Sequence, residues 1–514
     1  MSVETNINIS PITPSEQVKK TCSGIFMSEV KQTQTKFTYI SPNDYGREIR
    51  KLLFAPSYKG FSENSHRDLS AIAKIEKFSI LETSSPCFIR DSKLLRTDGA
   101  VLMANSSNSL NKALFRCAFR HKHLKNHHVS TLTDSRAFPK ASMGHVFQDK
   151  LQSLAHEQIK ETPVVQSRLY YEGGNIFRFT NTEGRQKALI GEDIITVTHL
   201  ALLKDEWFED NFASIANKSR KNEKAIDDEI SKQFFSGAVY TQTKQIAEDF
   251  AKTADDKTIL SILDEMSEMN LLDEMDFITE AEQTKGRDIA ANYYAQRLYI
   301  KNHLLPSELQ VKAEDIVEIP QIGYHIDLYM TPGPRGSIFV QDYDEAIRLL
   351  EHLLENSESL KLSQTDVKIL KAMILETSKL KSDFKEIMSD NKKTLEDAKF
   401  HIINTPGAFF SLAGESKTQN VNFLNCISGY STGTHRFYMA IPGTSVGDHL
   451  GRVLMESYVA FLNQHCENLD VFFIGSDPKN PNDFSETMSN LNEPEKNFGP
   501  HCQSFEHETS PVTI

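Results

Sequence analysis

Short apolar runs broken by a glycine-containing turn recur along the chain. Each run has apolar flanks, polar or glycine residues in its first strand and a glycine-containing turn, a pattern typical of a β-hairpin. Similar hairpins at intervals predict a repeated supersecondary unit. The stretches are CFIRDSKLLRTDGAVLMA (87–104, turn TDG), YYEGGNIFRFTNTEGRQKALIG (170–191, turn NTEG), YHIDLYMTPGPRGSIFVQD (324–342, turn PGPRG) and VNFLNCISGYSTGTHRFYMAIPG (421–443, turn STGT).

The segments between these hairpins carry the apolar spacing of helices. From about residue 205 to 305, apolar side chains recur three and four positions apart, as at Ile259, Leu263 and Met266. A second helical pattern runs from about 344 to 399. We interpret 204–318 as a helical insertion within a catalytic domain that spans 37–514. The Ser/Thr/Pro-rich residues 1–36 are expected to form a flexible N-terminal segment.

The composition is that of a soluble globular protein, with 39% hydrophobic and 25% charged residues. No apolar run is long enough to cross a bilayer, and the N-terminus lacks the basic start and apolar core of a secretory signal. We therefore expect a cytoplasmic protein, or one exported without a cleaved N-terminal signal, with no membrane partner. The net charge of −13 argues against nucleic acid as a partner and is compatible with a cationic substrate.

Motifs that would indicate several other chemistries are missing from the sequence. The 6 cysteines are scattered without a CxxC pair, so neither a zinc site nor a disulfide framework is predicted. No GxSxG elbow supports a nucleophilic serine, and no GxGxxG or P-loop supports a bound nucleotide. We expect neither a metal nor a cofactor.

Ionisable residues stand inside the apolar first strands predicted for three hairpins. Arg90 and Asp91 follow an apolar pair, and Glu172 follows two tyrosines. His325 and Asp327 flank one isoleucine, so strand alternation would turn both to the same face. A buried charge is costly unless it is paired or functional, and these residues are therefore candidates for a site.

A cysteine stands in a loop-like run near the end of the chain, Cys502 in FGPHCQSFEHE. A cysteine used for packing would more often lie inside an apolar helix or strand. We therefore interpret Cys502 as a nucleophile.

These motifs resemble the guanidino-group-modifying, or pentein, superfamily, which includes arginine, agmatine and protein-arginine deiminases and amidinotransferases. The resemblance rests on RD at 90–91, EGGN at 172–175, HID at 325–327 and HC at 501–502, in the family's order. It implies an α/β fold, a propeller of ββαβ repeats with pseudo-fivefold symmetry, here with a large helical insertion. The long gap between EGGN and HID and the run FGPH before the cysteine depart from the family pattern, which leaves the substrate open.

The resemblance also implies a substrate-binding set. Asp91 and Asp327 would hold the planar guanidinium by charge-assisted hydrogen bonds, which suit its fixed fork of N–H donors. Arg90 and Asn175 are assigned to the same set, and the asparagine after EGG is as in agmatine deiminases.

The resemblance further implies a catalytic set of Cys502, His325 and Glu172. Cys502 would attack the central carbon as a thiolate and form a covalent thiouronium intermediate. His325 would protonate the leaving nitrogen and then activate water. Glu172 would orient His325 or bind an N–H group of the substrate.

The sequence leaves three interpretations open. A deiminase would act on free arginine, agmatine or a protein arginine and give ammonia with a citrulline-type product, and the helical insertion slightly favours a protein substrate or partner. An amidinotransferase would pass the amidino group to an amine. A catalytically idle pentein scaffold would bind a partner through its helical insertion.

Overall fold

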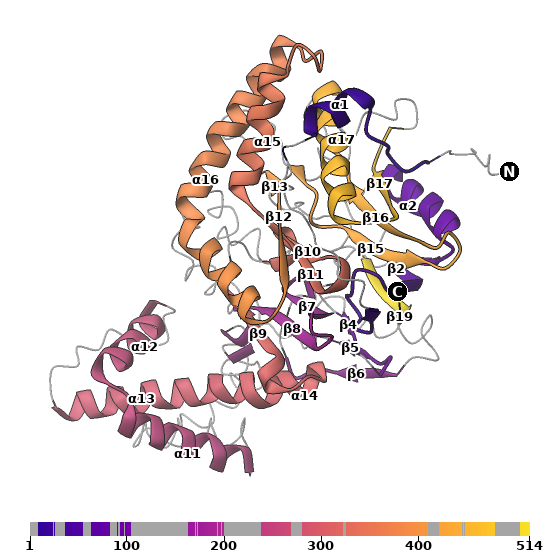
Figure 1. Ribbon diagram of the computed structural model, residues 1–514. Coiled ribbons are helices and arrows are strands. Elements are labelled where there is room, and N and C mark those ends of the chain that lie inside the picture. Colours follow the sequence, from indigo (N-terminus) through magenta and orange to yellow (C-terminus); the bar gives the residue numbers. More distant parts are fainter. Residues whose placement is uncertain are drawn as a thin grey trace.

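The computed structural model of the chain is a mixed α/β fold (Figure 1). The structure describes residues 9–23, 25, 36–54, 63–82, 90, 93–96, 98–103, 163–169, 171, 173–192, 194–196, 198–199, 238–268, 280–321, 325–406, 408–409, 421–444, 446, 448–477 and 504–513.

Five three-stranded sheets in this described part of the chain share one strand pattern. In each sheet two strands form an antiparallel pair, and a third strand lies parallel to the second. The last sheet joins the two ends of the chain, because its first strand is C-terminal and its other strands are N-terminal. The sheets are β4 (Lys93–Leu95), β5 (Val101–Met103) and β6 (Val164–Gln166); β7 (Ile176–Thr180), β8 (Gln186–Gly191) and β9 (Ile316–Ile319); β10 (Met330–Pro332), β11 (Ser337–Gln341) and β12 (His401–Thr405); β15 (Ile427–Ser431), β16 (Arg436–Pro442) and β17 (Leu469–Ile474); and β18 (Ser504–Ser510), β2 (Glu48–Phe54) and β3 (Ser79–Glu82).

In four of the five sheets, described helices connect the second strand to the third, since parallel strands need a long crossover connection, whereas the connection between β5 and β6 lies outside the described residues. Both predicted helical stretches are confirmed where the structure describes them, and residue 318, the predicted end of the insertion, falls inside β9. Helices α11 to α13 extend away from the sheets (Figure 1). None of the described helices is both long and apolar enough to span a bilayer. The connections hold α2 (Glu63–Glu76) between β2 and β3; α11 (Ala238–Thr253), α12 (Asp256–Glu268), α13 (Glu280–Tyr299), the π-helix η3 (Ile300–Leu304), α14 (Leu305–Leu309) and η4 (Ala313–Asp315) between β8 and β9; α15 (Tyr343–Glu355) and α16 (Gln364–Asp397) between β11 and β12; and α17 (Asp448–His465) between β16 and β17.

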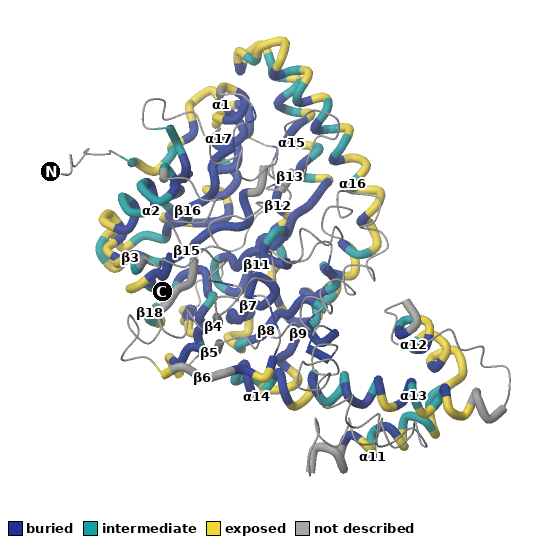
Figure 2. The backbone as a smooth tube through the Cα atoms, turned by 180° about the vertical axis from the view of Figure 1, so that it is seen from behind, coloured by how far each residue is buried: buried dark blue, intermediate teal, exposed yellow. Residues whose placement is uncertain are grey.

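Local sequence signals explain where the long helices begin. Asp342 caps α15 by accepting the backbone N–H groups of Asp344 and Glu345. Ser363 and Asp366 form a capping box at the start of α16. One face of α16 is buried and its outer face is exposed (Figure 2). The buried face carries Leu370, Met373, Thr377, Phe384, Met388, Asn391 and Leu395 at helical spacing.

All of the predicted hairpins are confirmed by antiparallel pairing of β4 with β5, β7 with β8, β10 with β11, and β15 with β16. In the turn PGPRG, Gly336 has a φ angle of 74°, which suits glycine. A side chain there would also collide with the backbone of Asn181 and Thr182 in the NTEG turn. Glycine thus lets two hairpins pack turn against turn.

The polar residues predicted inside first strands lie just before those strands. Gly173–Asn175 forms the 3₁₀ helix η2 before β7, and Ile326–Leu328 forms the 3₁₀ helix η5 before β10. Arg90 likewise precedes β4. The predicted strand alternation of His325 and Asp327 is therefore wrong, since a 3₁₀ turn sets their directions. Gly, Asn and Asp favour such turns over pleated strands.

The segment predicted to be flexible contains a packed helix, α1 (Glu16–Cys22). The backbone N–H and the hydroxyl of Ser15 both donate to Glu456 of α17, at 3.0 and 2.6 Å. Val18 of this helix is buried in the same apolar cluster as α17. For residues 16–22 the expectation of flexibility is wrong, because the partner of this helix is far away in the sequence.

Two short strand pairs complete the described part of the fold. They are β1 (Thr38–Tyr39) with β19 (Val512–Thr513), and β13 (Ala408–Phe409) with β14 (Val421–Asn422).

A buried histidine packs against α13 and makes the stability of the fold depend on pH. His199 is 1% exposed, and its Nε2–H donates to Oε1 of Gln296 at 2.6 Å. Burial lowers the pKa of His199 from 6.5 to about 3, and Arg297 adds to this effect while the bond to Gln296 opposes it. The folded state therefore holds a neutral imidazole that the unfolded chain protonates below pH 6.5.

We predict that acidification destabilises the wild type more than the His199→Gln variant. The contribution of His199 is fully present above pH 6.5 and falls as the pH is lowered, by about 2 kcal/mol at pH 5. Urea unfolding of both proteins at pH 8 and pH 5 measures the difference. An equal loss of unfolding free energy in the two proteins would contradict this assignment.

Candidate active site

The candidate residues share one position in the repeated sheet pattern. Arg90 precedes β4, Gly173–Asn175 precedes β7 and His325 precedes β10. Asn425 holds the equivalent position before β15. Cys502 stands in the sequence just before β18, the first strand of the remaining sheet, although it lies outside the described residues. The segment directly before each first strand therefore carries a polar candidate.

Gly174 holds the EGGN turn directly against the HID turn. A methyl group on its Cα would lie 2.5 Å from Nδ1 of His325 and 3.0 Å from Oδ2 of Asp327. Only glycine permits this approach, because it has no Cβ. The imidazole and the carboxylate therefore both face the same point of the EGGN backbone.

Asn175 fixes the backbone of the HID turn. Its Oδ1 accepts the backbone N–H of Ile326 at 3.0 Å and an Nε2–H of Gln321 at 3.1 Å. Asn175 is 6% exposed and Gln321 is fully buried. Since buried backbone groups need hydrogen-bond partners, Asn175 supplies the one that a neighbouring strand would supply in a sheet.

Arg90 joins this cluster from a neighbouring sheet. Its carbonyl oxygen and side chain lie against Gly173, where any side chain would collide with the carbonyl. Arg90 itself is 1% exposed. Contacts thus run from Arg90 through Gly173 and Gly174 to His325, so the segments before three different sheets meet.

His325 and Asp327 are the ionisable pair of the cluster. Nδ1 of His325 lies 3.9 Å from Oδ1 of Asp327, and the side chains are 0% and 1% exposed. This separation is longer than a hydrogen bond but within ion-pair range. Asn425 donates to the backbone carbonyl of Asp327 at 3.4 Å, which ties the turn to the segment before β15. A carboxylate and an imidazole shielded from water can bind a cation and exchange a proton with it.

Comparisons with known proteins give distant structural likenesses. No protein-family model matches this chain, and no curated protein matches it. A C. jejuni agmatine deiminase is 10% identical with a TM-score of 0.36, over 93% of this chain and 98% of that one. A cysteine-to-serine variant of C. jejuni agmatine deiminase with substrate bound is 10% identical with a TM-score of 0.34, over 90% and 97%. TM-scores this low do not establish a common fold, and the site is therefore assigned from its own residues.

Three predicted site residues, Asp91, Glu172 and Cys502, lie outside the described residues. Arg90, which precedes Asp91 in the sequence, contacts Gly173, which follows Glu172. The roles of all three residues stay predictions. Within the described ranges, no group of three His, Cys, Asp or Glu side chains is placed to hold a metal ion.

Two residues that the sequence did not single out help to position the site. Gln321 holds Asn175 from the end of β9, and a side chain at Gly191 would strike Gln321. Asn425 holds the carbonyl of Asp327. Asn425 occupies the same place before β15 as the HID turn does before β10, so the hairpin alignment alone could have indicated it. Gln321 follows a third strand and has no such signal.

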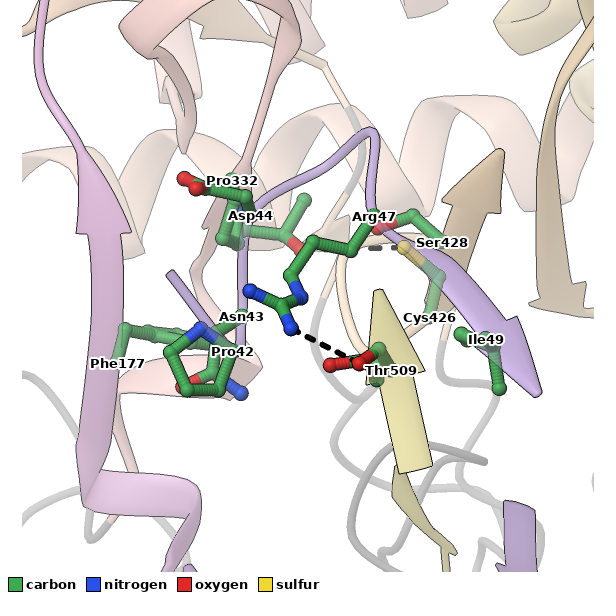
Figure 3. A pocket seen from close by; sticks show the side chains of 11 residues that line it. Pro42, Asn43, Asp44, Arg47, Ile49, Phe177, Pro332, Cys426, Ser428 and Thr509 are labelled. Carbon is green, nitrogen blue, oxygen red and sulfur yellow. Dashed lines mark hydrogen bonds between the residues drawn. The ribbon is translucent and has the colours of Figure 1, made fainter. Parts of the chain in front are cut away.

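A polar pocket lies between the first strands of four sheets (Figure 3). Its lining includes Phe177 of β7, Thr331 of β10, Ser428 of β15 and Thr509 of β18, together with Arg47. The HID residues are not part of this lining, so the pocket is distinct from the cluster around the HID turn. Because β7, β10, β15 and β18 all contribute to the lining of this one pocket, these four first strands lie close together in space.

We predict that Gly174→Ala destabilises the protein by about 1–3 kcal/mol, because the new methyl group forces the imidazole and carboxylate aside. Gly433→Ala is a matched control, since the nearest atoms to its methyl would be the methylenes and amine of the flexible Lys77 side chain, which can move. The control is expected to stay within about 0.5 kcal/mol of wild type in urea unfolding. Equal stability of both variants would show that the Gly174 contact is not tight.

Proposed function

We propose that the protein is a cysteine-dependent hydrolase that releases ammonia from a guanidino group. The contact of the EGGN turn with the HID turn carries this proposal. It brings a buried imidazole and a buried carboxylate together before a first strand, and Cys502 has the equivalent place in the sequence, before β18. Proton exchange, cation binding and a thiol nucleophile are the three elements that this reaction needs.

We also infer that the five sheets are arranged as a propeller. The common strand pattern, the pocket between four first strands and the pairing of the C-terminal β18 with the N-terminal β2 support a closed ring. In a ring, the segments before the first strands would all point to one central place. Cys502, Glu172 and Asp91 would thereby join His325 and Asp327.

The first half of the proposed reaction breaks a C–N bond. Asp327, with Asp91, would hold the guanidinium plane through charge-assisted hydrogen bonds. The Cys502 thiolate would attack the central carbon, forming a C–S bond. His325 would give its proton to the leaving nitrogen, which departs as ammonia and leaves a thiouronium on the sulfur.

The second half adds water. His325, now neutral, would take a proton from water while the oxygen bonds to the same carbon. The C–S bond then breaks and returns the thiolate, with a ureido group as the product. The remaining proton converts ammonia to ammonium, so that charge and atoms balance. Glu172 would orient His325 through both steps.

The substrate class is tested by comparing three compounds. We place a protein arginine first, since the projecting helices α11 to α13 could contact a macromolecule. Incubation with an arginine-rich protein, free arginine and agmatine, scored for ammonia and ureido product, decides among them. Deletion of the helices should then reduce the rate on protein more than the rate on small substrates. Absence of ureido product from all three would contradict the proposed reaction.

A transferase is distinguished by its product. With an added amine acceptor, a hydrolase still yields the ureido compound, whereas an amidinotransferase yields an amidinated amine. The same incubation with glycine or another primary amine therefore separates the two reactions.

A further inference from the structure

The pocket of Figure 3 brings together several hydrogen-bond donors from separate segments. Asn43 uses its Oδ1 to accept the backbone N–H of Arg178 at 3.0 Å, which leaves its amide N–H₂ as a donor. Ser428 adds a hydroxyl group to the lining. Arg47 adds a guanidinium, which Figure 3 shows extending between Pro42 and Thr509.

Arg47 is bound only to neutral acceptors within the described part of the chain. It donates to the backbone carbonyls of Ile40 and Thr509, the latter at 3.0 Å. Its Nε is shielded from solvent and makes no hydrogen bond to any described residue. Carbonyl partners do not cancel the charge of a guanidinium, so a positive group faces the pocket.

A second guanidinium, that of Arg178, interacts electrostatically with Arg47. Arg178 follows Phe177 of the lining, is 1% exposed, and donates to the carbonyl of Leu309 at 3.2 Å. Its Nε likewise has no hydrogen bond among the described residues. Burial lowers the pKa of Arg178 to about 10, which leaves it charged at neutral pH. A buried charge whose hydrogen-bond partner is neutral favours a nearby counter-charge.

Asp44 is the carboxylate of the pocket lining, and its oxygens already have partners. Oδ1 accepts the backbone N–H of Thr180 at 2.6 Å, and Oδ2 accepts that of Ser41 at 2.6 Å. Asp98, a second carboxylate that acts on Arg178, is itself paired with Arg96 at 3.0 Å. The negative charge of Asp44 therefore offsets one of the two remaining guanidiniums. A net positive charge therefore remains around the pocket.

We propose that this pocket binds a small oxyanion, such as a carboxylate or an inorganic oxyanion, through Arg47 with Asn43 and Ser428 as further donors. The planar fork of a guanidinium matches a pair of oxygen atoms on one ligand. Because Arg47 also holds Ile40 and Thr509, a bound anion would strengthen the contact between the N-terminal segment and β18. The site does not depend on the reaction at His325.

Thermal unfolding of the full chain at pH 7.5 tests the site with acetate and with phosphate, at ionic strength held constant with a bulky organic salt. A saturable rise of the unfolding temperature by roughly 1–3 °C is expected for wild type. Arg47→Gln should abolish the rise. Arg185→Gln should keep it, because Arg185 is a surface arginine paired with Asp315 at 2.8 Å.

Crystals of the wild type soaked in selenate provide a second, direct measurement. An anomalous selenium peak within hydrogen-bond distance of Arg47 supports the site, even where Arg47→Gln fails to fold. Selenium peaks only outside this pocket, or an equal temperature rise in Arg47→Gln, would overturn it. A rise with phosphate but not acetate identifies the inorganic oxyanion as the ligand class, and the reverse identifies a carboxylate.

Discussion

Replacing Cys502 by alanine is expected to lower the rate of ammonia release from a guanidino substrate by at least about 10³-fold, because the attacking sulfur is lost. The described thiols offer no substitute. Cys22, Cys426 and Cys466 are all buried. Burial raises the pKa of Cys466 to about 12 and also raises the pKa of Cys22. A thiol that stays protonated is a poor nucleophile, so these cysteines cannot replace Cys502. The kcat of Cys502→Ala, measured at saturating substrate, should therefore fall by the full factor.

Cys466→Ala is the matched control, since it makes the same cysteine-to-alanine change at a buried core position. This residue is 4% exposed, so the variant should lose stability but retain its kcat. Labelling with iodoacetamide adds an independent readout: the wild type should be modified at Cys502, and saturating substrate should protect it. A Cys502→Ala enzyme with wild-type kcat would refute the nucleophile and would favour the idle scaffold that binds a partner.

The hairpins could be predicted from the sequence because their signals are local. Turn glycines and the apolar runs that flank them lie within about twenty residues of one another, and β4 with β5, β7 with β8, β10 with β11 and β15 with β16 pair as those signals indicate. The N-terminal packing could not be predicted in this way. Ser15 finds its partner at Glu456, and β2 pairs with β18, over most of the length of the chain. No local pattern encodes such long-range pairing.

The sequence indicates which residue types to consider for the candidate site, but it does not give their geometry. A strand was expected to align His325 with Asp327, yet a 3₁₀ turn holds them, and Gly174 brings both to the EGGN backbone. Gln321 donates a hydrogen bond to Asn175, and Asn425 donates one to the carbonyl of Asp327. Both hydrogen bonds join elements that meet only in the folded chain. Spacing in the sequence can therefore nominate chemical groups, but the contacts that orient them come from topology.

The repeat of the sheets also gives a reason for the position of Cys502. Each described first strand is preceded by a polar segment, and three such segments touch around Gly173 and Gly174. The strand β18 has the same place in its sheet as β7 and β10 have in theirs. Cys502, as the proposed nucleophile, would thus meet groups from the middle of the chain, because the N-terminal β2 and β3 complete the last sheet.

His325→Gln is expected to lower kcat by about 10²–10⁴-fold for an ordinary guanidino substrate, because the leaving nitrogen then lacks a proton donor. Water activation by His325 is lost with both substrates, so the comparison uses the first half of the reaction, measured as single-turnover release of the leaving group. In that half the loss should be much smaller for an S-alkyl isothiourea, whose thiolate leaving group departs without protonation. A positioning role alone would slow both substrates alike, so the ratio of the two single-turnover rates tests the role directly. His449→Gln, which alters an imidazole bonded to the carbonyl of Leu360 at 2.7 Å, should leave both rates unchanged. If His325→Gln slowed the two substrates equally, the proton donor would have to be sought elsewhere, and the full burial of His325 beside Asp327 would then serve binding of the cation alone.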